Sequence, residues 1–141
     1  MVHFFTKSIF SLIIENMELA NKTIYQVFVR NYSPQGDFRS LENDLPRIRD
    51  LGIDILYLMP IHKIGEIGRK GTYGSPYSIQ DYYSISPDLG TLEDFVHLVE
   101  SVHAIGMEII LDMVFNHTAR DSILFFFSSR ILLSEGRRNR Q

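Results

Sequence analysis

Residues 107–118, MEIILDMVFNHT, constrain the fold more than any other stretch of the chain. Two apolar runs, residues 109–111 and 113–115, are separated only by Asp112. This pattern is typical of a strand that is covered on both faces in a parallel sheet. The stretch then ends in three consecutive polar residues, Asn116, His117 and Thr118. Ligands of α/β folds bind at the C-terminal ends of strands, so we expect a functional site at this edge.

Two further strands are predicted upstream of this stretch. Residues 23–32, TIYQVFVRNY, are rich in β-branched and aromatic residues, which favour a strand. Residues 53–59, IDILYLM, predict a second strand that Pro60 ends. The glycine-rich connection over residues 61–90 is long for a compact domain, and connections of this length are usually functional or disordered.

A helix is predicted in each of the two intervals between these strands. In the first, apolar residues recur at helical spacing up to Gly52, and Pro46 suits the first turn of a helix that begins near Asn43 or Asp44. The second helix is expected to open at Thr91 with a capping box and to end at Gly106. The residues at helical spacing in the first interval are Leu41, Leu45, Ile48 and Leu51, and the apolar stripe of the second helix is Leu92, Phe95, Val99 and Val102.

The resulting order is β-α-β-α-β, which implies parallel strands with right-handed crossovers. The chain repeats one local pattern: residues 51–56 and 105–110 each place a helix end, with a glycine, directly before a strand. Periodicity alone leaves open whether the sheet is an open one or part of a closed barrel. We expect a leader over residues 1–20, a domain over residues 21–122 and a divergent or unstructured tail over residues 123–141.

Charge and composition exclude several classes of function. A formal net charge of -3 argues against general affinity for nucleic acid. The absence of cysteine excludes a disulfide framework and a cysteine nucleophile. No stretch approaches the roughly 20 apolar residues that span a bilayer, so no membrane association is expected. These features fit a cytoplasmic protein and leave secretion open.

Several segments resemble the α-amylase family of glycoside hydrolases. Residues 112–117, DMVFNH, are similar to the first signature region of that family, Asp-x-Val-x-Asn-His at the end of the third barrel strand. Residues 75–83, SPYSIQDYY, resemble the family segment between the second strand and the second helix. Residues 24–28 resemble its first strand, and residues 90–95 the start of its second helix. The resemblance covers residues 21–122 in the family's order.

The resemblance implies a partial (β/α)8 TIM barrel, an α/β fold of which this chain carries the first three β-strands and two to three helices. A complete barrel typically needs about 250 residues, with its active site at the C-terminal ends of the strands. The family's retaining mechanism uses two aspartates and a glutamate on later strands, and no segment after Thr118 resembles those regions. The expected function is therefore that of a fragment of an enzyme acting on α-linked glucosides, inactive alone.

The resemblance also assigns roles to individual residues. It implies that Tyr77 and His117 bind the sugar on one side of the cleaved bond, Tyr77 as an aromatic platform and His117 as a hydrogen-bonding partner. Asp112 and Asp81 are expected to support the site, and no catalytic residue is assigned to this chain. Asn116 matches a position that coordinates a structural calcium in many members, whereas other members lack the ion. No cofactor is otherwise expected.

Two alternatives to an enzyme fragment remain open at this stage. The chain is either a non-catalytic module that binds sugar through Tyr77 and His117, or an unstable truncation product. Three strands of a barrel leave an open edge, which favours self-association. The expected partner is an α-glucan or a maltooligosaccharide, but the sequence does not specify the linkage or distinguish hydrolysis from transfer.

Overall fold

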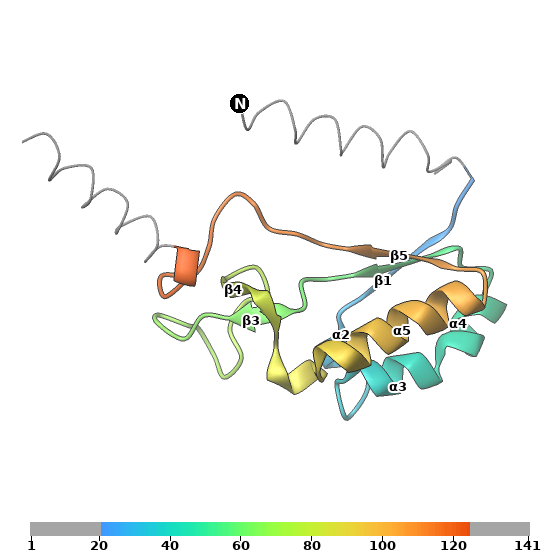
Figure 1. Ribbon diagram of the computed structural model, residues 1–141, viewed down its shortest axis with the longest axis horizontal. Helices are drawn as coiled ribbons and strands as arrows, with labels where there is room; N and C mark the ends of the chain where they lie inside the picture. Colours follow the sequence, from blue (N-terminus) through green and yellow to red (C-terminus); the bar gives the residue numbers. More distant parts are fainter. Residues whose placement is uncertain (1–20, 125–141) are drawn as a thin grey trace, which may run out of the picture.

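The computed structural model describes residues 21–124, which fold around a three-stranded parallel sheet (Figure 1). The strands are β1 (Ile24–Val27), β2 (Ile55–Leu58) and β5 (Glu108–Leu111), with β2 in the centre. Both pairings are parallel, as the sequence predicts: Ile24 of β1 is opposite Ile55 of β2, which is opposite Glu108 of β5. The three C-terminal ends of the strands therefore lie at one edge of the sheet.

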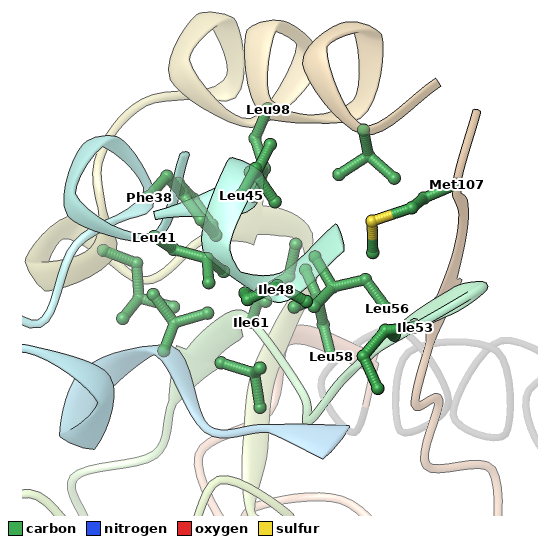
Figure 2. Close-up of a cluster of buried hydrophobic side chains, with 14 residues drawn as sticks. Phe38, Leu41, Leu45, Ile48, Ile53, Leu56, Leu58, Ile61, Leu98 and Met107 are labelled. Atoms are coloured by element: carbon green, nitrogen blue, oxygen red, sulfur yellow. The ribbon is translucent and has the colours of Figure 1, made fainter. Parts of the chain in front are cut away.

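Helices α3 (Phe38–Asn43), α4 (Leu45–Asp50) and α5 (Leu92–Ala104) lie on one face of this sheet (Figure 1). Leu56 and Leu58 alternate with Tyr57 along β2, so the two leucines face the helices and Tyr57 faces away from them. Figure 2 shows how the apolar side chains from strands and helices meet between the two layers. Phe38, at the start of α3, is fully buried there, with its ring centroid 5.5 Å from that of Phe95 on α5.

The first predicted strand is only half right. Strand β1 ends at Val27, and a single helical turn, α2 (Val29–Tyr32), follows where the sequence predicts continued strand. The side chain of Val29 is buried in the core, and the amide of Asn31 donates to the carbonyl of Phe28 at 2.9 Å. β-Branched and aromatic residues do not distinguish a strand from one buried helical turn, so composition misses this change.

The first predicted helix is two helices. Helix α4 begins at Leu45, close to the predicted start near Asn43 or Asp44, with Pro46 in its first turn. The prediction omits α3, whose amino end is capped by the Asp37 carboxylate accepting from the Ser40 amide at 2.8 Å. The chain breaks at Asp44 because Pro46 has no amide hydrogen with which to continue the hydrogen bonds of α3.

The capping box of α5 is confirmed: the Thr91 hydroxyl accepts from the Asp94 amide, and the Asp94 carboxylate accepts from the Thr91 amide. Its buried stripe is shifted from the prediction. Leu98 and Val102 are fully buried, whereas Leu92 is 67% exposed. Leu92 is the first helical residue and lies before the part of the helix that packs on the sheet.

The long connection contains a second, two-stranded antiparallel sheet formed by β3 (His62–Ile64) and β4 (Ile79–Ile85). A 3-10 helix (Pro87–Leu89) then leads into α5. Strand β5 is shorter than predicted, and its residues are half-buried rather than covered on both faces. This difference arises because β5 has one neighbour within the described sheet and the helices cover only one face.

Some expectations fall on residues that the structure does not describe. The leader over residues 1–20 and most of the tail, from residue 125 onward, lie outside the described residues. Within residues 21–124 no helix is long and apolar enough to cross a membrane.

Truncation of Phe38 tests the packing between the two layers. We expect Phe38→Ala to lower the free energy of unfolding by about 3–5 kcal/mol, because it removes a fully buried ring and leaves a cavity. Leu92→Ala, at an exposed position of α5, serves as the control and should change the free energy of unfolding by less than about 0.5 kcal/mol. Urea unfolding followed by circular dichroism measures both, and equal effects would contradict this description of the core.

His62 generates a second prediction, on pH dependence. The ring is buried at the start of β3, 5.8 Å from the Tyr82 ring centroid, with Nε2 3.2 Å from the sulfur of Met113. Burial lowers the pKa of His62, and the backbone of Ser84 and the negative charge of Asp81 offset this only in part. The unfolded chain therefore binds this proton at a higher pH than the folded chain, so stability should decrease as pH falls below about 6.5.

His62→Gln should reduce this decrease, because glutamine does not titrate. The measurement is the urea midpoint at pH 7.5 and pH 5.5 for the wild-type chain, His62→Gln and the control His103→Gln, whose side chain is exposed. The pH dependence would belong to another group if the loss of stability between pH 7.5 and pH 5.5 were unchanged in His62→Gln but smaller in His103→Gln.

Candidate functional site

The candidate site lies at the C-terminal edge of the parallel sheet, around Asp112. This residue directly follows β5, and its amide donates to the carbonyl of Leu58 at the end of β2, at 2.8 Å. Strand alternation places Asp112 on the same face as Ile110, which is paired with Tyr57 of β2. Asp112 therefore faces away from the helices, at the end of the central pair of strands.

Tyr77 contacts Asp112 from the connection that precedes β4. Its hydroxyl donates to Oδ2 of Asp112 at 3.1 Å, although the two residues are 35 positions apart. Burial raises the pKa of the Tyr77 phenol, and the hydrogen bond to the Asp112 carboxylate raises it further. The phenol therefore keeps its proton and acts as a donor to the carboxylate at neutral pH.

Tyr57 lies with Tyr77 and Asp112 in a third position of the candidate site, and the sequence analysis does not predict it. Burial raises the pKa of Tyr57, and the negative charge of Asp112 raises it further. A usable signal exists in the sequence: Tyr57 interrupts an aliphatic strand and alternates with two inward leucines. That alternation points a polar aromatic side chain away from the helices, one residue before the end of β2.

Tyr82 of β4, to which the sequence analysis assigns no role, hydrogen-bonds to the segment after Asp112. The Tyr82 hydroxyl donates to the carbonyls of Val114 at 2.6 Å and His117 at 3.1 Å. On the same strand, the carbonyl of Ile79 accepts from the Thr118 hydroxyl at 3.0 Å and from the Ala119 amide at 2.9 Å. These contacts fix the backbone that carries His117.

His117 itself is exposed, and none of the hydrogen bonds formed within residues 21–124 involves its imidazole. The ring is therefore available to a ligand as both donor and acceptor. The structure joins Tyr77 to Asp112 by a direct contact, whereas His117 is tied to this group through the backbone that follows Asp112.

Asp81 has a local structural contact. Its Oδ1 accepts from the Tyr83 amide at 2.8 Å, two residues along β4. No hydrogen bond within the described part of the chain joins Asp81 to Tyr77 or Asp112. A second carboxylate, Asp121, has the bridging role that sequence reasoning did not assign: its Oδ2 accepts from the Glu66 amide and from Nε2 of Gln80, both at 2.8 Å.

Asn116 is exposed on the segment that follows β5. Within residues 21–124 there is no group of three or more Asp, Glu or His side chains that could hold a metal ion. Asn116 would contribute a single amide oxygen, whereas calcium takes six to eight oxygen ligands. Most ligands of a calcium site at Asn116 would therefore be other groups, and calcium binding stays a prediction.

The chemistry of this edge suits recognition of a polyhydroxylated ligand. Two phenols, one carboxylate and an accessible imidazole offer aromatic surface together with donors and acceptors. A retaining glycosidase needs two carboxyl groups about 5 Å apart across the bond that breaks, and Asp112 is one carboxylate. Within residues 21–124, the group around Asp112 therefore offers one carboxylate and not the pair that this reaction needs.

Comparison with known proteins gives consistent relatives. A family model described as the α-amylase catalytic domain matches residues 11–135. An α-1,4-glucan:maltose-1-phosphate maltosyltransferase from Myxococcus xanthus is 40% identical over 109 residues, which cover 64% of this chain and 16% of that protein. A trehalose synthase from Thermus thermophilus is 39% identical over 103 residues, which cover 70% of this chain and 10% of that protein.

Solved structures agree with these relatives. An α-amylase from Lactobacillus plantarum superposes with a TM-score of 0.76 at 54% identity, covering 78% of this chain and 26% of that one. A maltogenic α-amylase from Thermotoga neapolitana superposes with a TM-score of 0.74 at 46% identity, covering 78% and 27% of the two chains. This chain thus spans about a sixth or less of the two curated relatives and about a quarter of these solved chains. It belongs to the α-amylase family of glycoside hydrolases.

Proposed function

We propose that this chain forms the first three strands of an α-amylase-type (β/α)8 barrel and supplies the sugar-binding side of its active site. The observation that carries the proposal is the Tyr77–Asp112 hydrogen bond at the C-terminal edge of the sheet, which is where barrel enzymes bind substrate. In this proposal Tyr77 stacks on the apolar face of the sugar ring, and His117 hydrogen-bonds its hydroxyls.

Asp112 acts as a supporting carboxylate. It accepts a hydrogen bond from the Tyr77 hydroxyl and so holds the tip of the aromatic ring in place. Asp81 acts further away, by holding the backbone of β4 through the Tyr83 amide. Because Tyr82 of the same strand holds the carbonyls of Val114 and His117, the geometry of β4 also sets the position of His117.

The proposed substrate class is an α-linked glucoside. The names of the relatives include an α-1,4-glucan maltosyltransferase, an α-glucosidase and α-amylases, so both hydrolysis and transfer occur among them. A complete enzyme built on this chain would act on an α-glucan or maltooligosaccharide with retention. We propose that the 141-residue chain alone has no turnover, because the family resemblance places all three catalytic carboxylates on later strands.

The alternative function is that of a non-catalytic module, which would likewise bind sugar without turnover. The exposed imidazole of His117 supports this alternative, because it is available to a ligand. We also propose that the chain associates with itself. Strands β1 and β5 each have one neighbour in the described sheet, so each offers an edge to another strand.

Maltose titration tests the proposed role of Tyr77. We expect weak binding by the wild-type chain, a loss of about tenfold or more in Tyr77→Ala, and a smaller loss in Tyr77→Phe, because phenylalanine keeps the stacking surface. Tyr83→Ala is the matched control, since Tyr83 is 86% exposed on β4. Chemical-shift changes of backbone amides measure the affinity, and equal losses in Tyr77→Ala and Tyr83→Ala would contradict the assignment.

Incubation of the purified chain with maltooligosaccharides tests the absence of turnover. We expect no release of reducing sugar and no transfer products, because the resemblance places the catalytic carboxylates on later strands and Asp112 alone does not supply the pair that a retaining glycosidase needs. Asp112→Asn provides a check for contaminating enzyme. Activity that the wild-type chain shows and Asp112→Asn lacks would refute the proposal, and activity common to both would indicate a contaminant.

A further inference from the structure

Arg30 joins two parts of the chain that are more than 40 residues apart. It belongs to α2, and its guanidinium carbon lies 4.7 Å from the ring centroid of Phe28 and 4.9 Å from that of Tyr73. Its Nη2 also donates to the carbonyl of Gly74 at 3.4 Å. None of the ion pairs formed within residues 21–124 includes Arg30, so stacking and this hydrogen bond account for its described contacts.

The backbone of Arg30 is held firmly. Gly36 has a φ of +68° and lies so close to the Arg30 carbonyl that a Cβ at position 36 would be 2.6 Å from its oxygen. The Gly36 amide donates to the Ser33 hydroxyl at 2.9 Å, which closes the turn after α2. Arg30 therefore projects from a packed turn, whereas Tyr73 is 55% exposed on the glycine-rich connection.

The stacked segment leads directly to Tyr77. Gly74 is packed against the side chain of Arg69, whose Cγ would be 2.7 Å from a Cβ at position 74. The hydroxyl of Ser75 accepts from the Tyr77 amide at 3.3 Å, and the carbonyl of Ser75 accepts from the Ser78 amide at 3.0 Å. A displacement of Tyr73 and Gly74 would thus be transmitted through one tight turn to the Tyr77 ring.

We infer that Arg30 is a positioning residue, which clamps Tyr73 and Gly74 to α2 and thereby sets the orientation of the Tyr77 ring over Asp112. It acts on the sugar site only through this loop. The effect of Arg30 on sugar binding rests on the function proposed above for Tyr77. The effect of Arg30 on the orientation of Tyr77 is independent of that function.

Arginine suits this place for a physical reason. A planar guanidinium stacks on two aromatic rings and still directs an N–H in its own plane to a carbonyl. Lysine keeps the positive charge but does not have the planar group, so Arg30→Lys separates the stacking from the charge. Tyr73→Phe keeps the ring on which Arg30 stacks, and Tyr73→Ala removes it.

The test follows Tyr77 directly, without sugar, in the full chain labelled with carbon-13 at the tyrosine Cζ. The Tyr77 signal is assigned with Tyr77→Phe. Burial and the hydrogen bond to Asp112 raise the pKa of Tyr77 in the wild-type chain. In Arg30→Lys and Tyr73→Ala we expect this pKa to move back towards about 10. We also expect amide exchange at residues 73–77 to become about tenfold faster in these two variants. Tyr73→Phe should behave like the wild-type chain.

Controls separate positioning from general destabilisation. Burial also raises the pKa of Tyr82, which should stay raised in every variant. Arg39→Lys, at an exposed position of α3, should leave both tyrosines unchanged. An unchanged Tyr77 in both Arg30→Lys and Tyr73→Ala would overturn the inference, as would a shift of Tyr77 and Tyr82 together. Since Tyr73 is largely exposed, Tyr73→Ala remains informative if Arg30→Lys fails to fold.

Maltose titration of the same variants then distinguishes the two proposals. Binding by the wild-type chain that weakens in Arg30→Lys and Tyr73→Ala, but not in Tyr73→Phe, supports both. A wild-type chain that does not bind maltose, but whose Tyr77 responds to these substitutions as described, refutes the sugar-binding function and supports the positioning role.

Discussion

The structure depends on the burial of one side of the central strand. Leu56 and Leu58 of β2 pack under the helices and are fully inaccessible to solvent, and β2 hydrogen-bonds to a parallel strand on each side. Because β2 alternates, the packing of these two leucines directs Tyr57 to the opposite face. The same parallel pairing aligns the ends of β2 and β5, so the carbonyl of Leu58 meets the amide of Asp112. The candidate site is therefore a geometric consequence of the core.

The sequence predicted the elements with strong periodicity or specific caps. The parallel pairing of the three main strands and the capping box at Thr91 are confirmed. The errors occur where tertiary contacts override local preference. Val29 has strand-forming character but enters the core from a helical turn, and Leu92 precedes the part of α5 that packs on the sheet. The β3–β4 sheet was missed because composition marks its glycine-rich connection only as a loop.

The candidate site was predictable to the extent that it follows a continuous motif. Residues 112–117 pointed to the C-terminal edge of the sheet, where Asp112 follows β5, and the proximity of Tyr77 to Asp112 is consistent with the fold implied by the resemblance. The contacts of Tyr82, Asp121 and Arg30 were not predictable, because each joins residues that lie more than 30 positions apart. Such pairs depend on the path of the long connection, which periodicity does not specify. The roles of Tyr77 and His117 in sugar binding remain proposals.

The separation of the paired strands along the chain has a consequence for folding kinetics. Ile24 pairs with Ile55 and Ile55 with Glu108, so joining β1 to β2 closes a loop of about 31 residues and adding β5 closes one of about 53. Contacts between residues distant in sequence form slowly, since the chain must lose entropy before they stabilise it. We therefore expect β1, α3, α4 and β2 to assemble as an early unit, with β5 and the segment that bears Asp112 added last. During synthesis on the ribosome, the same order would follow from the emergence of the chain, so the candidate site would form only after β1 and β2 have paired.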